Sequence, residues 1–358
     1  MGSIQDINTS GTPSPFESKR MFDHINSPQD EYLRRNDLRG EDELEREELE
    51  RVEGVKVTRY HKFRRIVREP LAEMMGSMIL IVAGDGAVAQ SILSNHSNGN
   101  STTINLCFGF GLTVGYLCAV AGGAAGHLNP AITVTNCIFR GFPWKKLPIY
   151  AFAQMMGCGI GAAIVYGTYR NALTNFDGGI RQVVGEFTTA GIFCTYPTAF
   201  LDLPGKVMQE FTCSAILAVF VNAIACQASP KLPYKLATEW HLIRALLLGL
   251  ALFTIGSSIG WQTGYAMNPA RDFAPRLVSF MAGYGHEVFS AYGHYFWIPL
   301  IIPFPGAIFG QAIFDFMVYD GESENIVTDP VGTVESIKGT VNSDLRRRNA
   351  ATRGEKTV

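Results

Sequence analysis

Long apolar runs separated by short polar loops fill the middle of the chain. Six runs of mostly apolar residues lie at about 70–92, 105–125, 147–169, 208–228, 241–260 and 295–318. A helix needs about 20 such residues to cross a hydrocarbon core roughly 30 Å thick. A soluble helical bundle supplies one or two runs of this kind, but not six in series. The pattern therefore predicts an all-α, multi-pass membrane protein with six transmembrane helices.

Two further apolar segments, residues 121–141 and 260–283, do not fit as spans. Each is a Gly/Ala-rich stretch followed by a short helix-compatible run, and each contains the tripeptide Asn-Pro-Ala: Asn129, Pro130 and Ala131 in the first, Asn268, Pro269 and Ala270 in the second. Each copy follows the second span of one half, and three spans per half place the second half in the opposite orientation. The sequence therefore predicts two re-entrant half-helices that meet midway through the bilayer, in inverted repeats at about 68–170 and 207–319.

Asparagine followed by proline is a helix-start signal. Asparagine accepts a backbone N–H bond as the N-cap, and proline has no N–H to satisfy at the first helical position. We expect the NH₂ groups of the two asparagines to donate into a lumen, and the two helix N-termini to repel hydronium and other cations. The arrangement predicts passive passage of neutral hydroxylic molecules without ion leakage. Backbone carbonyls would accept from the permeant at Gly126, His127, Gly264 and Tyr265.

Charge is concentrated at the two ends of the chain. Charged residues make up 17% of the sequence and apolar residues 47%, and most of the charge lies in residues 1–70 and 320–358. We therefore expect a largely disordered cytoplasmic N-terminal tail over 1–67, a channel domain over 68–319 and a cytoplasmic C-terminal tail over 320–358. The net charge of −2 indicates no basic surface for nucleic acid.

The sequence contains no nucleotide-binding loop, catalytic triad or acid–base pair in a plausible cleft. We therefore expect no enzymatic activity and no cofactor. His127 has no second His or Cys at ligand spacing, which disfavours a metal site.

Lysine and arginine are distributed asymmetrically among the short loops. They lie before the first span and after the second, fourth and sixth, whereas the loop at 93–104 has none. That loop instead carries two N-glycosylation sequons, at Asn95 and Asn100. Both patterns predict that the two termini are cytoplasmic. We expect the plasma membrane as the location.

The stretches Gly-His-Leu-Asn-Pro-Ala (126–131) and Gly-Tyr-Ala-Met-Asn-Pro-Ala-Arg-Asp (264–272) resemble those of the major intrinsic proteins, the aquaporins and aquaglyceroporins. The resemblance covers roughly residues 66–320. It implies that two matching glutamates, Glu73 and Glu210, anchor the irregular loops from behind the pore, since a carboxylate inside a membrane needs partners. A proton relay is the alternative role. The resemblance also implies a homotetramer.

Within this family the chain is similar to glycerol-conducting members, and to fungal ones in particular. The glycerol-type positions are Asp272, Arg276, Pro299 and Leu300. The resemblance also implies a constriction formed by Arg271, Tyr265, Gly256 and Phe108, with Phe110 as the alternative for the last. Gly256 stands where strict water channels place a histidine, so the resemblance implies less bulk there and a wider, more apolar slot. Such a slot suits glycerol as well as water, small polyols, urea or hydrogen peroxide.

Three other functions stay open from the sequence. One is an aquaporin selective for water or hydrogen peroxide, with little glycerol flux. Another is a non-conducting member of the family that acts through its tails. The third is a coupled secondary transporter, for which Glu73 and Glu210 would be the candidate titratable groups in the membrane.

Overall fold

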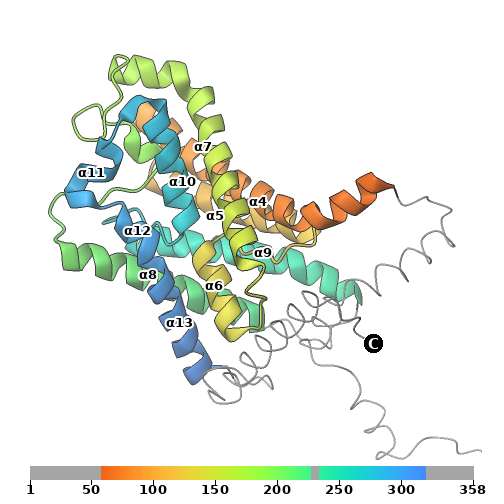
Figure 1. Ribbon diagram of the computed structural model, residues 1–358. Helices are drawn as coiled ribbons and strands as arrows, with labels where there is room; N and C mark the ends of the chain where they lie inside the picture. The colour runs from red at the N-terminus through yellow and green to blue at the C-terminus, as the bar shows by residue number, and fades with distance from the viewer. Residues whose placement is uncertain (1–57, 227–233, 320–358) are drawn as a thin grey trace, which may run out of the picture. The chain divides into compact units, whose positions relative to one another are not determined.

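The computed structural model describes residues 58–226 and 234–319, and every regular element in these ranges is a helix (Figure 1). Within these two ranges, five helices are long and apolar enough to cross a membrane. They are α4 (Arg59–Leu93), α5 (Ser101–Ala121), α7 (Leu147–Asp177), α8 (Leu203–Cys226) and α9 (Tyr234–Ile259). They coincide with the first five predicted spans, and the boundaries differ most at the start of α4. The predictions for residues 1–57 and 320–358 lie outside the described residues.

The sixth predicted span forms two hydrogen-bonded segments, α12 (Trp297–Ile301) and α13 (Pro303–Met317). Pro303 and Pro305 lack an N–H, so the hydrogen-bond ladder breaks there. Ile302, between the segments, keeps helical dihedrals of φ −65° and ψ −29°. The sixth span is therefore one helical path interrupted by its prolines. Shorter elements join the spans: η1 (Ala190–Ile192), η2 (Phe280–Tyr284) and α11 (Glu287–His294).

The long helices pack against one another both across and within the two halves of the chain. α5 of the first half packs against α9 of the second, and α8 packs against α13 within the second half (Figure 1). Glycines four residues apart allow the third helix of each half to approach the backbone of the first: Gly157 and Gly161 of α7 against α4, and Gly306 and Gly310 of α13 against α8. A Cβ on Gly161 would lie 2.8 Å from the carbonyl oxygen of Met78. Small residues commonly serve close helix packing in membranes, and here they do so at matching places in both halves.

Two short helices, α6 (Pro130–Phe139) and α10 (Pro269–Ser279), follow the second helix of each half. With 10 and 11 residues they are each about 15 Å long, or half of a bilayer core. α6 packs on α7 and α13, α10 packs on α7 and α12, and the two contact each other. The predicted all-α architecture of six spans and two half-helices is confirmed.

Large apolar side chains are exposed along the outer faces of the long helices. Phe110 on α5, Phe152 on α7 and Leu250 on α9 are each more than half exposed. A monomeric soluble protein rarely exposes contiguous apolar surface of this kind. Hydrocarbon is the solvent that such faces fit, in agreement with a multi-pass membrane protein.

Candidate functional site

Each half-helix begins at an asparagine that caps it. The Asn129 Oδ1 accepts a hydrogen bond of 2.9 Å from the backbone N–H of Ala131. The Asn268 Oδ1 accepts bonds of 3.0 Å and 3.3 Å from the N–H groups of Ala270 and Arg271. Both asparagines have extended backbones, with φ of −153° and −141°. The same local sequence thus produces the same helix start twice.

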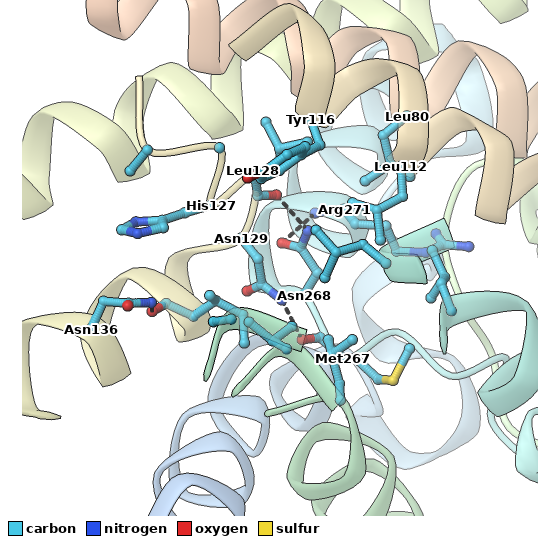
Figure 2. Close-up of a pocket in the computed structure, with 18 of the residues that line it drawn as sticks. Leu80, Leu112, Tyr116, His127, Leu128, Asn129, Asn136, Met267, Asn268 and Arg271 are labelled. Atoms are coloured by element: carbon cyan, nitrogen blue, oxygen red, sulfur yellow. Dashed lines mark hydrogen bonds between the residues drawn. The ribbon is translucent and has the colours of Figure 1, made fainter. Parts of the chain in front are cut away.

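The two asparagines also tie the half-helices together. The Asn129 Nδ2 donates to the carbonyl oxygen of Met267 at 2.9 Å, and the Asn268 Nδ2 donates to that of Leu128 at 2.8 Å (Figure 2). The expectation that each NH₂ group is wholly free to face a lumen is therefore corrected, because one of its two hydrogens bonds the opposite loop. Each NH₂ group carries a second hydrogen that this bond does not use. The pairing joins segments far apart in sequence, so the local motif could not reveal it.

The residues just before the caps have a strained backbone. Leu128 and Met267 both have φ of 51°, a left-handed conformation that is uncommon for residues other than glycine. Such strain persists only where the surroundings determine it fully. Here the opposite asparagine holds each carbonyl, and a buried glutamate holds each N–H. Neither residue was predicted from the sequence, although both stand directly before Asn-Pro-Ala and this shared position was a signal.

The buried glutamates bind the loop backbones directly. Glu73 accepts bonds of 2.8 Å from the N–H groups of both His127 and Leu128, and one of 2.9 Å from Gln154 Nε2. Both Glu73 and its counterpart in the second half, Glu210, are fully buried. Each carboxylate therefore supplies the acceptors that an irregular loop inside a membrane needs.

Glu210 repeats these contacts in the second half. It accepts from the N–H groups of Ala266 and Met267 at 3.2 Å and 3.0 Å, and from Thr263 Oγ1 at 2.6 Å. The two loops are thus held by the same chemistry, one from each half of the chain.

We expect Glu73→Gln to destabilise the protein. The amide would turn an NH₂ group towards a backbone N–H, and a buried donor without a partner costs about 1–3 kcal/mol. The thermal midpoint of the purified protein in detergent should fall by about 2–4 °C for each kcal/mol lost. Glu287→Gln, at an exposed position on α11, is the matched control and should leave the midpoint unchanged. A Glu73→Gln protein as stable as this control would contradict the anchoring role.

A cavity of about 280 Å³ opens at the junction of the half-helices. Figure 2 shows Asn129 and Asn268 side by side within it. Its wall is mainly apolar and comes from α4, α5, α8 and α9, through Leu80, Leu112, Leu217, Val221, Leu248 and Leu252. Of the residues predicted to offer carbonyls, Gly126, His127 and Tyr265 line the cavity and Gly264 does not. A few polar groups in an apolar tunnel suit a small molecule with both kinds of surface.

Two aromatic rings and an arginine meet at one part of this cavity. The rings of Phe108 and Tyr265 are 6.1 Å apart, edge to face, and the guanidinium carbon of Arg271 lies 4.7 Å from the centre of the Phe108 ring. Phe108 is buried, whereas Phe110 is 54% exposed on the outer face of α5. The structure therefore places Phe108, and not Phe110, beside Tyr265 and Arg271.

Gly256 lies behind Tyr265 and is not part of the cavity lining. A Cβ at this position would be 2.8 Å from both the Tyr265 Cζ and the Asn105 Oδ1. The Tyr265 hydroxyl donates to that same oxygen at 2.6 Å. The absent side chain of Gly256 thus leaves space that the phenol ring fills, instead of the open slot that the sequence suggested. Asn105, which fixes the ring, was not singled out from the sequence.

The glycerol-type residues of α10 form a fully buried ion pair beside the pore. Asp272 Oδ1 lies 2.8 Å from Arg276 Nη2 and 3.0 Å from Nε, while Asp272 Oδ2 accepts from the N–H and hydroxyl of Thr195 at 2.7 Å and 2.6 Å. This set ties α10 to the segment before α8. Pro299 and Leu300 lie on α12, which packs on α10, away from the cavity lining.

At another part of the cavity Arg140 forms a two-point ion pair. Its guanidinium donates to both carboxylate oxygens of Asp315, at 2.9 Å and 2.6 Å, and lies 4.6 Å from the centre of the Tyr319 ring. Arg140 follows the end of α6, and Asp315 is on α13. The pair therefore fixes the C-terminal end of a half-helix to the sixth span. The sequence had indicated Arg140 only as a loop charge.

The two sequon asparagines are exposed in the connection between α4 and α5. Asn95 lies in the turn after α4, and Asn100 caps α5 by accepting from the N–H of Thr103 at 3.1 Å. The amide nitrogen, which a glycan would modify, takes no part in that cap.

The geometry agrees with comparisons to known proteins. The chain matches the family described as "Major intrinsic protein" over residues 60–314. It is 44% identical over 270 residues to "Probable aquaglyceroporin-2" of Gibberella zeae, covering 74% of this chain and 76% of that protein. It is 41% identical over 254 residues to "Aquaporin-9" of Homo sapiens, covering 71% of this chain and 83% of that protein. The crystal structure of the aquaglyceroporin from Plasmodium falciparum resembles it with a TM-score of 0.60 at 26% identity, covering 70% of this chain and 96% of that one. Because the match spans most of the chain and includes all six spans and both half-helices, the protein belongs to the major intrinsic protein family.

Proposed function

We propose that this protein is a passive membrane channel for water and small neutral solutes, chiefly glycerol, and that it excludes protons and ions. The observation that carries the proposal is the junction where Asn129 and Asn268 cap two half-helices, bond the opposite loops and line one cavity. Both helix N-termini point to this junction, so their dipoles oppose cations there. The amide hydrogens left over donate to a water or hydroxyl oxygen.

A hydroxylic solute would meet two kinds of surface in turn. At the constriction its carbon chain lies against the rings of Phe108 and Tyr265, while its hydroxyl oxygens accept from the guanidinium of Arg271. At the junction an oxygen accepts from Asn129 and Asn268, which turns its hydrogens away from the centre. Because a water held in this way accepts from the protein on both sides, the hydrogen-bonded chain that a proton needs is broken.

Glycerol is proposed over water alone for two reasons. The relative from Gibberella zeae carries the name aquaglyceroporin, and this chain is 44% identical to it. The constriction is also amphipathic, with aromatic faces on one side and a single charged edge on the other. Small polyols, urea and hydrogen peroxide share the size and polarity that such a slot admits.

We also propose an orientation in the membrane and an oligomeric state for the chain. Lys and Arg in the loops after the second and fourth spans, together with the basic segment before the first, support cytoplasmic termini. The exposed sequons at Asn95 and Asn100 would then face the outside of a plasma membrane. We further propose a homotetramer, on the basis of family membership.

Stopped-flow light scattering on vesicles containing the full chain tests the function. The vesicles first shrink in a hyperosmotic glycerol solution and then re-swell as glycerol enters. We expect both phases to be about tenfold faster than in empty vesicles, which corresponds to about 1.4 kcal/mol off the barrier to permeation. Asn268→Ala should slow both phases, since it removes a cap and a cross-loop bond.

The same experiment separates two of the alternatives. Fast shrinkage without glycerol re-swelling would indicate a channel selective for water. Rates equal to those of empty vesicles, with Asn268→Ala indistinguishable from wild type, would indicate a non-conducting protein that acts through its tails. Either result would overturn the proposal of a glycerol channel.

A further inference from the structure

Asp85 is a buried acidic residue that the proposed conduction path does not explain. It lies in α4 between Gly84 and Gly86, and its side chain is completely buried. Neither of its carboxylate oxygens has a hydrogen-bond partner among residues 58–226 and 234–319. A carboxylate in an apolar interior is costly without partners, so it marks a functional position. From the sequence, only Glu73 and Glu210 were candidate acids within the membrane.

The other buried acids near the pore already have partners of their own. Glu73 and Glu210 accept from loop N–H groups. Asp272 pairs with Arg276, and Asp315 pairs with Arg140. The charges of those two arginines are therefore balanced locally. Of the three arginines that line the cavity, Arg140, Arg244 and Arg271, it is Arg271 that has an ion-pair contact with Asp85.

Asp85 faces Arg271 from behind the pore wall. It is four residues from both Ile81 and Ala89, and these share a buried cluster with Ala270 and Ala274 of α10. The distance from Asp85 Oδ1 to Arg271 Nη1 is 3.9 Å. That nitrogen, like the carboxylate, has no hydrogen-bond partner in the described part of the chain. A buried carboxylate and a buried guanidinium nitrogen, neither with a hydrogen-bond partner in the described residues, thus face one another.

We propose that Asp85 is a positioning residue for Arg271, on the basis of the channel function proposed above. Its charge draws one arm of the guanidinium towards α4, so that the side chain stays against Phe108 and the remaining N–H groups face the solute. It also offsets part of the arginine charge from behind, which sets how strongly the guanidinium repels a cation in the constriction. The charge there is therefore set by two helices, one from each half of the chain.

A double-mutant cycle in reconstituted vesicles tests this coupling. The four proteins are wild type, Asp85→Asn, Arg271→Val and the double variant, and the rates are expressed per amount of protein inserted. Asp85→Asn has nearly the same shape as the native residue, and in the wild-type background it should lower glycerol re-swelling about threefold to tenfold. In the Arg271→Val background it should change the rate by less than about twofold, because the group on which it acts is gone.

A second measurement, the rate of proton entry into the vesicles, depends on the charge of Asp85 and not on how its side chain packs. Arg271→Val leaves the Asp85 carboxylate alone behind the constriction, where it attracts cations. Proton entry, followed with an entrapped pH-sensitive dye, should therefore be about tenfold slower in the double variant than in Arg271→Val. A residue that served only helix packing would not lower this leak.

The control is another Asp–Arg pair that lies away from the cavity. Asp177 and Arg181, 2.7 Å apart at the end of α7, allow Asp177→Asn to be compared in both backgrounds, where we expect no change in flux or leak. Asp85→Ala is measured alongside. Because it removes the polar group, it shows whether an effect of Asp85→Asn comes from the buried amide itself and not from loss of the carboxylate. The proposal would be overturned if Asp85→Asn lowered the glycerol re-swelling rate by the same factor in both backgrounds, or if it changed the rate in neither. It would also be overturned if Asp85→Asn did not lower the proton leak of Arg271→Val. Wild-type vesicles that fail to pass glycerol would instead overturn the proposed function itself.

Discussion

Arg271→Val is expected to turn a proton-tight pore into one that leaks protons and small cations. The Arg271 guanidinium lines the cavity beside Phe108, and we expect its charge to repel a cation there. A unit charge about 4 Å away contributes about 4 kcal/mol at an effective dielectric constant of 20. Since about 1.4 kcal/mol corresponds to a factor of ten, even a third of that energy predicts a proton leak about tenfold larger. The leak is measured by two-electrode voltage clamp, or with a pH-sensitive dye in vesicles.

Arg181→Val is the matched control for the loss of a charge. Arg181 pairs with Asp177 at the end of α7 and is not part of the cavity lining, so its removal should cause no leak. Glycerol and water should still pass the Arg271→Val pore, because valine is smaller than arginine. A leak no larger than that of wild type would place Arg271 off the permeation path.

Gly256→His is expected to reduce glycerol flux much more than water flux. The new side chain would enter the space that the Tyr265 ring fills and displace its hydroxyl from Asn105. We expect the displaced ring to move towards the cavity and to narrow the slot beside Phe108. Glycerol is larger than water and should slow at least about tenfold, which needs only about 1.4 kcal/mol at the constriction, while water slows about twofold or threefold.

Smaller substitutions provide a graded version of the same test. Gly256→Ala should have the same effect in weaker form, because the nearest atoms are the movable ends of two side chains. Gly167→Ala, on an exposed face of α7 with open space around it, is the matched control and should change neither flux. Both fluxes are measured on the same vesicles, by shrinkage and re-swelling. Equal falls in the two fluxes would show that Gly256 affects stability and not selectivity.

Local sequence was sufficient for the spans and the helix starts. Apolar runs of about 20 residues predict spans because lipid requires every backbone group to be satisfied within the helix. Asn129 and Asn268 cap helices because Asn-Pro specifies that start from its own chemistry. The sixth span was predicted as one helix, but Pro303 and Pro305 interrupt its hydrogen bonds and divide it into two segments. The helical path nevertheless continues through Ile302.

The contacts between the two halves could not be obtained in the same way. The sequence placed the NH₂ groups of Asn129 and Asn268 in a lumen, but each donates to a carbonyl of the opposite loop. It also left Phe108 and Phe110 as alternatives, because no signal along the chain specified which of the two positions on α5 faces the cavity. Gly256 was understood as an opening, because nothing along the chain shows that the Tyr265 ring packs against it.

The sequence by itself determined that this chain is a membrane protein of six spans with two half-helices that begin at Asn-Pro-Ala. These features depend on the length, polarity and dihedral preferences of neighbouring residues. Only the tertiary structure decided which residues line the cavity. It also decided that Asp85 faces Arg271, because these two residues are far apart along the chain. Charge and hydrogen bonding act through space over a few ångströms, so their partners are fixed by the packing of the helices and not by the order of residues.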